Sequence, residues 1–214
     1  CLFQNIGYVK IELGEDMIKL KNRKPVPLGN AGIFAVLILL VGEEGREEIL
    51  FEKRSLNIRQ PGEVSLPGGR VEAGESYEEA ALRETKEEIG IDPSKIEILG
   101  ELDYLVASNR MIRSFVGRTE DFDQNRFRQN DEVESIFTVP VKYFLENPPK
   151  NYNTPMRIQL QDDFPYERIP SGKDYPFGEY VHSVPLYLDT DPLIWGFTAR
   201  IVDGFIKRLE VESC

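Results

Sequence analysis

The sequence predicts an α/β fold, and three stretches carry that prediction. The apolar run Ile33–Val41 is too short to span a bilayer and is typical of a strand buried on both faces. A capping box of Ser76 and Glu79 predicts the start of a helix that ends near Gly90. Asp191–Pro192 predicts the start of a second helix, whose apolar face packs on the core.

The other segments fit one large domain, because 214 residues suffice for a single core. Further strands are predicted at 49–55 and, beyond the first helix, in KIEILGELDYLV and MIRSFVGRT. Segment 147–180 is dense in proline, glycine and aromatic residues, which indicates a long functional loop or irregular strands. We expect residues 1–28 to form an N-terminal arm or helix and residues 29–214 to form the domain.

Charge narrows the range of partners. The formal net charge is −11, which argues against generic binding to nucleic acid or to an anionic membrane surface. An anionic small molecule would need local help from a metal ion or from arginine. Exposed strands could pair in a homodimer, although no motif in the sequence specifies one.

The few histidine and cysteine residues exclude several kinds of site. One histidine, His182, and two cysteines, Cys1 and Cys214, cannot build a histidine-rich zinc site or a closed cysteine cluster. A serine–histidine or cysteine–histidine couple would depend on His182, which we expect to be a hydrogen-bonded strand or loop residue. Nothing in this cysteine usage requires an oxidising compartment, so a cytoplasmic location is expected.

Three acids of the first helix form the candidate metal site. Glu84, Glu87 and Glu88 fall within one helical sector of about 100°. Alone, such a run is typical of a solvated helix face, where like charges cost about 0.2–0.5 kcal/mol per pair. A hard dication such as Mg²⁺ or Mn²⁺ would turn the repulsion into attraction.

Residues around the helix favour the metal site over the solvated face. Gly68 and Gly69 precede it and let the backbone approach a ligand or metal without a Cβ clash. Arg83 can hold Glu75 in a bidentate pair and so fix the loop against the helix. The fixed spacing of these residues makes a metal site the better interpretation.

The same residues resemble the Nudix box of the Nudix hydrolases. The match consists of Gly69, Glu75 and the run RETKEEIGI from Arg83 to Ile91, and its one departure is Thr85, where a bulky aliphatic residue is usual. The resemblance implies an α/β/α sandwich around a mixed β-sheet and hydrolysis of a nucleoside diphosphate linked to another group. It also implies catalytic roles for Arg83 and for three acids that bind Mg²⁺ or Mn²⁺, namely Glu84, Glu87 and Glu88.

The general base stays open at this point. Across the family it comes either from the box or from a distant loop, and segment NDEVES offers Glu132 and Glu134. Both acids are equally well explained as ordinary surface residues.

A second resemblance concerns the substrate. Residues 50–69 are similar to the pattern that precedes the box in coenzyme A pyrophosphatases, with matches at Arg54, Ser55, Arg59, Gly62, Pro67, Gly68 and Gly69. Glu52 stands where threonine is usual, Leu66 replaces phenylalanine, and the gap from Arg59 to Gly62 is one residue short. Segment IWGFTAR, residues 194–200, resembles a tryptophan-glycine segment of the same subfamily.

The resemblance implies cleavage of coenzyme A or its thioesters to 3′-phosphoadenosine 5′-phosphate and 4′-phosphopantetheine. Arg54 and Arg59 are the candidate phosphate clamps, since arginine binds phosphate bidentately, and Gly68 and Gly69 complete the substrate-binding set. A Nudix pyrophosphatase acting on ADP-ribose or another nucleoside diphosphate derivative is the alternative. A non-catalytic nucleotide-binding module is a weaker one, because the box acids are all present.

Overall fold

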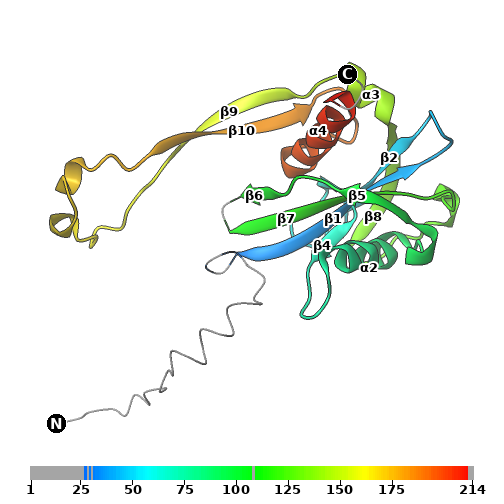
Figure 1. Cartoon of the computed structure of the whole chain (residues 1–214), viewed down its shortest axis with the longest axis horizontal. Helices are drawn as coiled ribbons and strands as arrows, with labels where there is room; N and C mark the ends of the chain where they lie inside the picture. Colours follow the sequence, from blue (N-terminus) through cyan, green and yellow to red (C-terminus); the bar gives the residue numbers. More distant parts are fainter. Residues whose placement is uncertain (1–26, 28, 30, 108, 212–214) are drawn as a thin grey trace, which may run out of the picture. The chain divides into compact units, whose positions relative to one another are not determined.

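The structure is a computed structural model that describes residues 27, 29, 31–107 and 109–211. The chain divides into the units 1–31 and 32–214. The predicted N-terminal arm or helix at 1–28 lies outside the described residues, apart from single positions, so the description concerns the second unit (Figure 1).

A mixed sheet of eight strands forms the centre of this unit. Strands β3, β2, β1, β7 and β5 lie in that order, while β4 pairs with β1, β6 with β7 and β8 with β2. Strands β1 and β7 are parallel, and the other pairs are antiparallel. The strands are β1 Gly32–Val41, β2 Glu48–Arg54, β3 Val64–Ser65, β4 Gly68–Arg70, β5 Glu97–Glu101, β6 Leu105–Ala107, β7 Arg110–Arg118 and β8 Val133–Pro140.

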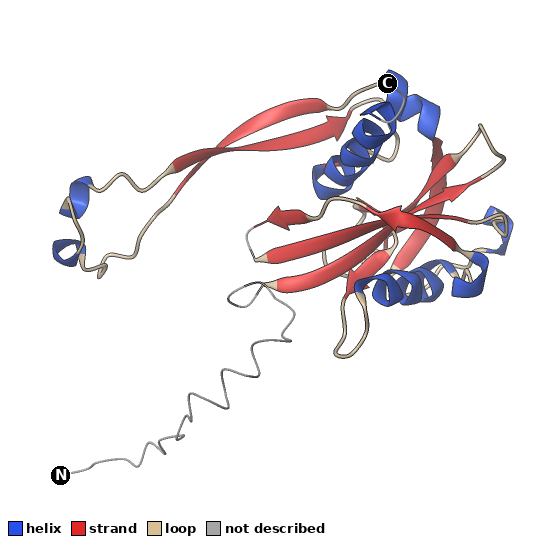
Figure 2. Cartoon of the chain, in the orientation of Figure 1, coloured by secondary structure: helices blue, strands red, loops and turns tan. Residues whose placement is uncertain are grey.

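Helices cover both faces of the sheet (Figure 2). Alternate residues of β1 point to opposite sides, so Leu37 and Leu39 pack in one core with α2 (Tyr77–Ile89). Ile38 and Leu40 pack in the other core with α4 (Gly196–Val211), and α3 (Val141–Glu146) adds Phe144 to it. This arrangement confirms the α/β/α sandwich and the strand buried on both faces.

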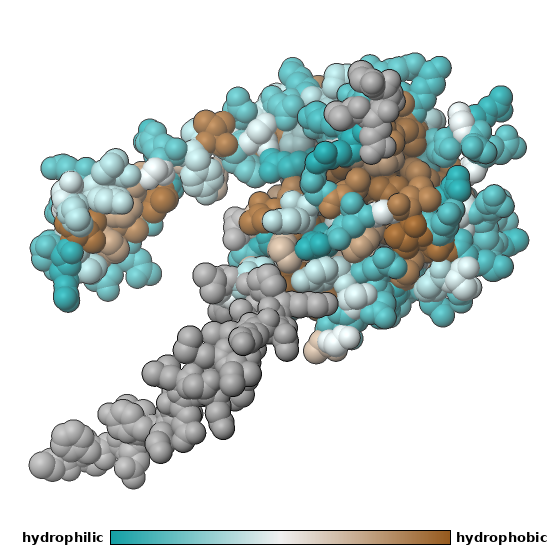
Figure 3. Space-filling view, viewed as in Figure 1, coloured by the Kyte–Doolittle hydropathy of each residue, from teal (hydrophilic) through white to brown (hydrophobic). Residues whose placement is uncertain are grey.

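The segment predicted as a long loop or irregular strands combines regular strand with a long loop, because only residues 150–157 and 179–180 of it are β-strand and residues 158–178 form the loop between them. β9 (Lys150–Arg157) pairs antiparallel with β10 (Glu179–Tyr187), and β10 also pairs with β11 (Ile194–Trp195). The side chains of β9 are exposed, so their pattern carried no signal of a buried strand. At the tip, four aromatic rings pack together and apolar side chains gather (Figure 3), the rings being Phe164, Tyr166, Tyr175 and Phe177.

The last helix begins later than the sequence indicated. Asp191–Pro192 does not cap it, because Ile194 and Trp195 first pair with Tyr187 and Leu186 as strand β11. The helix α4 starts at Gly196, and its expected apolar face lies in the core.

Candidate active site

Helix α2 has the start and end that the sequence predicts. The Ser76 hydroxyl accepts a hydrogen bond from the Glu79 amide at 3.2 Å, and the Glu79 carboxylate accepts one from the Ser76 amide at 2.7 Å. Gly90 ends the helix in the left-handed conformation, with φ of 85°. Both ends of the acid-bearing helix are therefore fixed by local sequence.

Two glycines of β4 bring the backbone against this helix. The Gly68 amide donates to Glu88 Oε2 at 2.8 Å. A Cβ on Gly68 would lie 2.3 Å from the Ala35 carbonyl oxygen, and one on Gly69 would lie 2.3 Å from Glu84 Oε1. Glycine at position 68 lets β4 lie close to β1, and glycine at position 69 leaves room for the Glu84 carboxyl group next to the strand.

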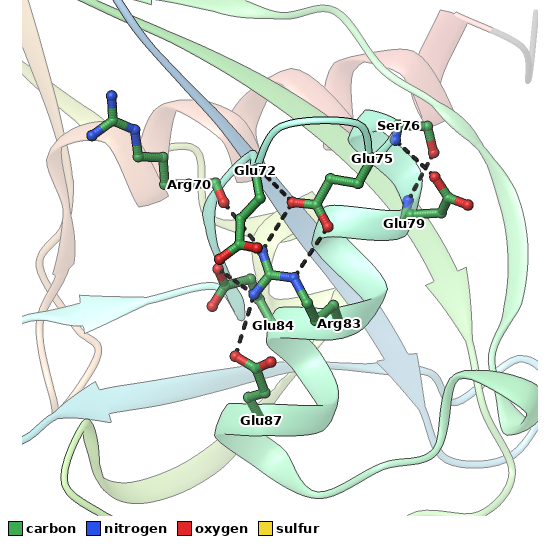
Figure 4. A network of polar contacts seen from close by, with 8 residues as sticks. All are labelled: Arg70, Glu72, Glu75, Ser76, Glu79, Arg83, Glu84 and Glu87. Atoms are coloured by element: carbon green, nitrogen blue, oxygen red, sulfur yellow. Dashed lines mark hydrogen bonds and ion pairs between the residues drawn. The ribbon is translucent and has the colours of Figure 1, made fainter.

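Arg83 is the cation at the centre of a network of five hydrogen bonds to four residues (Figure 4). Its guanidinium binds Glu75 in the predicted bidentate manner, at 3.1 and 3.0 Å. The same group also donates to Glu84 at 3.0 Å, to Glu87 at 3.2 Å and to the Arg70 carbonyl oxygen at 3.2 Å. Arg83 therefore neutralises part of the repulsion between the helix acids and ties the loop to the helix.

The three predicted metal ligands differ in exposure. Glu88 is buried, with 4% of its surface exposed, and the Glu84 side chain is 15% exposed. The Glu87 side chain is 60% exposed and lies at the rim. A solvated helix face would expose all three, so this alternative does not describe the site.

A fourth acid, Glu52 of β2, lies beside Glu88 and was missed as a functional candidate by sequence reasoning. It is 1% exposed, and the Ser65 hydroxyl donates to its Oε1 at 2.8 Å. The resemblance marked Glu52 only as a departure from a pattern. The one available signal was a charged residue within an otherwise apolar strand.

Burial controls the protonation of these acids. It raises the pKa of Glu88 above the ordinary 4.5, and the charge of Glu52 raises it further. Burial likewise raises the pKa of Glu52, and burial raises that of Glu84 against the opposing effect of Arg83. Without a cation, the buried acids of the site therefore retain protons at higher pH than exposed glutamates do.

Hydrogen bonds distinguish the two acids proposed as general base. Asn130 donates to the Glu88 carbonyl oxygen at 2.9 Å and accepts from the Glu132 amide at 2.9 Å, which holds this loop at the end of α2. The negative charge of Glu132 raises the pKa of both Glu84 and Glu88, so Glu132 lies near these acids. Glu134 instead pairs with Lys53 at 3.1 Å. The arrangement favours Glu132 as the candidate.

A cavity of about 320 Å³ adjoins Gly68 on the side of the sheet that α4 covers. Its lining is mainly apolar, with polar and aromatic groups from distant parts of the chain, among them Arg54, His182, Trp195, Phe197 and Arg200. The size and the mixture suit a small-molecule site. The sequence indicated Trp195 and Arg200 only through resemblance and did not connect His182 with the site, because β10 brings it there.

The two predicted phosphate clamps lie differently. Arg54 lines the cavity, and its Nε donates to the Arg59 carbonyl oxygen at 3.2 Å. Arg59 itself is exposed on the loop. The structure thus brings Arg54 and Gly68 together at the cavity, whereas Arg59 is not among the residues that line it.

The donor set of the site fits a hard dication. Every candidate ligand is a carboxylate oxygen, Gly69 leaves space beside Glu84, and Glu52 Oε2 is buried without a hydrogen-bond partner among the described residues. Among those same residues, no three acidic, histidine or cysteine side chains are close enough to form a ready metal cage. Arg83 draws Glu84 and Glu87 toward itself, so metal binding requires their carboxylates to turn.

The sandwich fold and the acids of α2 together indicate a class of protein, the hydrolases of phosphoanhydride bonds. A family model described as the NUDIX domain matches residues 33–159. The chain therefore belongs to the Nudix hydrolase family, whose members act on pyrophosphate bonds and generally use divalent metal ions such as Mg²⁺.

Known relatives agree with the family. Nudix hydrolase 3 of Caenorhabditis elegans is 31% identical over 83% of this chain and 73% of its own. The mouse peroxisomal coenzyme A diphosphatase NUDT7 is 34% identical over 61% of this chain and 56% of its own. A MutT/nudix family protein from Enterococcus faecalis has the same fold, with a TM-score of 0.52, 15% identity and coverage of 94% and 71% of the two chains.

Within the described part of the chain, no helix combines the length and hydrophobicity that crossing a bilayer requires. The cytoplasmic location and the homodimer stay predictions, and one relative carries a peroxisomal name.

Replacing Gly69 tests the space beside Glu84. We expect Gly69→Ala to displace the Glu84 carboxylate and to weaken Mn²⁺ binding by about tenfold or more, as changes next to metal ligands do. Gly100→Ala is the matched control, because a Cβ there meets no atom within 4 Å. Calorimetric titration of both variants with Mn²⁺ checks this. Equal affinities would contradict the role of Gly69 in leaving room for the Glu84 carboxylate.

The raised pKa values predict how stability depends on pH. The folded protein keeps protons on Glu52 and Glu88 at pH values where the unfolded chain has lost them, so their contribution to the free energy of unfolding falls as pH rises above 4.5. Mg²⁺ competes with those protons. We expect Mg²⁺ to raise Tm more at about pH 8 than at about pH 5.5. Thermal unfolding in EDTA and in Mg²⁺ measures this, and a larger rise at the lower pH would contradict it.

Proposed function

We propose that the chain hydrolyses the pyrophosphate bond of coenzyme A or its thioesters, with Mg²⁺ or Mn²⁺ as cofactor. The products would be 3′-phosphoadenosine 5′-phosphate and 4′-phosphopantetheine. The observation that carries the proposal is the cavity beside Gly68, since Arg54 of the coenzyme A pattern and Arg200 of the tryptophan-glycine segment both line it. The similarity to NUDT7 supports the same substrate class.

The chemistry of the ligand suits this cavity. Coenzyme A carries a 3′-phosphate, a pyrophosphate, an adenine and a long pantetheine arm. Arg54 and Arg200 offer guanidinium groups for phosphate, while Trp195 and Phe197 offer aromatic surface for the adenine or the arm. Gly68 lies at the cavity wall and donates to Glu88, so a pyrophosphate at this end would lie next to the acids.

Different residues would bind the metal, position its ligands and accept the proton during hydrolysis. Glu84 and Glu88 would hold the dication, with Glu87 at the rim, and Arg83 positions Glu84 and Glu87 through its hydrogen bonds. A bound dication neutralises phosphate charge and lowers the pKa of the attacking water. Glu132 would take the proton of that water, and Asn130 keeps the loop of Glu132 against α2.

The base assignment is tested by two matched substitutions. We expect Glu132→Gln to lower kcat by about 100-fold or more, because the variant cannot accept a proton. Glu134→Gln has the same change of charge two residues away, on an acid paired with Lys53, and we expect its kcat to stay within about threefold. Steady-state kinetics over a pH series checks both. If Glu132→Gln keeps the same kcat as Glu134→Gln, Glu132 is not the general base, and an acid of the Nudix box becomes the candidate.

The substrate assignment is tested with a panel of coenzyme A, acetyl-coenzyme A, dephospho-coenzyme A, ADP-ribose and a dinucleoside polyphosphate. We expect coenzyme A or its thioester to have the highest kcat/KM. Arg54→Ala should lower kcat/KM for coenzyme A by about tenfold, and less for dephospho-coenzyme A, if Arg54 binds the 3′-phosphate. Chromatography of the products measures each rate.

Arg118→Ala is the control for this variant, since Arg118 pairs with Glu97 at 2.9 Å and does not line the cavity. Preference of the wild type for ADP-ribose by about tenfold would overturn the coenzyme A proposal and leave pyrophosphate hydrolysis standing. An equal loss for coenzyme A and dephospho-coenzyme A would remove the 3′-phosphate role from Arg54.

A further inference from the structure

Glu52 of β2 faces the acid-bearing helix from the sheet. Side chains alternate along a strand, and Leu50, two residues before Glu52, packs in the core that α2 covers. Glu52 points to the same side and is buried. A glutamate at this position in a strand needs an explanation, because burying a carboxylate is costly unless it is paired.

Only one oxygen of this carboxyl group is accounted for. Ser65, the partner of Glu52 in β3, donates to Oε1 at 2.8 Å. Oε2 is buried and accepts no hydrogen bond from a donor group among the residues that the structure describes, and the carboxyl group lies against that of Glu88, which is another acid. Unpartnered buried oxygens are uncommon in folded proteins, and a bound ion is one of the groups that complete them.

The neighbours of Glu52 make a cation the fitting partner. The negative charge of Glu52 repels that of Glu88 and raises the pKa of Glu88. The negative charge of Glu132 likewise raises the pKa of both acids. These acids come from three separate elements, a strand, a helix and the loop before β8, and Arg54 is the cation that acts on Glu52. A hydrogen-bond donor would satisfy one oxygen, whereas a dication would also remove the repulsion among the acids.

We propose that Glu52 is a metal-binding carboxylate in this chain and that a dication is held between strand β2 and helix α2, by Glu52 together with Glu88. The inference rests on the metal-dependent hydrolysis proposed above. Ser65 fixes Oε1 and so leaves Oε2 for the cation. Because the coenzyme A pattern has threonine here, the extra charge distinguishes this chain from that pattern.

The placement gives the site a rigid side. Glu84 and Glu87 are engaged by Arg83 and must turn to bind metal, but Ser65 holds Glu52 at Oε1, and Oε2 accepts no hydrogen bond from a donor in the described part of the chain. Glu52 would therefore set where the dication lies, and the helix acids would close around it.

Binding of Mn²⁺ to the full chain tests this, measured by electron paramagnetic resonance of free Mn²⁺ and by calorimetry. Glu52→Gln keeps the size and the acceptor for Ser65 but removes the charge, and Glu52→Thr installs the residue of the coenzyme A pattern. We expect both to weaken Mn²⁺ binding by about 10–100-fold. Glu48→Gln is the matched control, with the same change in the same strand at a glutamate bonded to Thr138, and should keep wild-type affinity.

The outcomes are distinct. If the wild type binds Mn²⁺ and both Glu52 variants bind it equally well, Glu52 is a structural acid and the inference is wrong, while the proposed function stands. If the wild type binds no Mn²⁺, the metal dependence and the role of Glu52 both fail. Thermal unfolding in EDTA verifies that the variants are folded, and a loss of affinity in variants with wild-type Tm supports the inference.

Discussion

The hydrogen bond from the Gly68 amide to the buried carboxyl group of Glu88 joins the sheet to the acid-bearing helix. A buried carboxyl group is tolerated only where its environment supplies donors, protons or cations. That requirement is served by glycine at positions 68 and 69, because a Cβ at 68 would collide with Ala35 of β1 and a Cβ at 69 with Glu84, so glycine lets the β4 backbone come close to the acids. It also explains the raised pKa of Glu88, because one amide does not replace the water that burial removes.

The mutual repulsion of Glu84, Glu87 and Glu88 on α2 is reduced in two different ways. Arg83 supplies positive charge to Glu84 and Glu87, while Glu75 orients the guanidinium through two hydrogen bonds. Glu88 lies outside this network and depends on burial, protons and the Gly68 amide. The helix therefore carries two acids balanced by arginine, Glu84 and Glu87, and a third, Glu88, that is buried against the sheet.

The parts of the site that depend on residues close together in the sequence could be predicted. They are the caps of α2, the two glycines at positions 68 and 69, and the Arg83–Glu75 pair. The parts that depend on pairing between distant strands could not be predicted. Glu52 reaches Glu88 through the order of β2 and α2 in the sandwich, and His182 reaches the cavity through pairing of β10. The exposed β9 lacks the alternation by which strands are found, and segment 147–180 was therefore expected to be a loop or irregular strands.

Gly68 links the two halves of the proposed function, because its amide donates to Glu88 and its backbone also lines the cavity. The acids depend on contacts within the Nudix box, whereas the cavity is built from β2, β10, β11 and α4, whose sequences lie mostly outside the box. Substrate choice can therefore vary with the cavity residues while the acids keep the same chemistry. Membership in the family accordingly fixes the bond that is cleaved, while in our proposal the cavity residues Arg54, His182, Trp195 and Arg200 select the molecule that carries it.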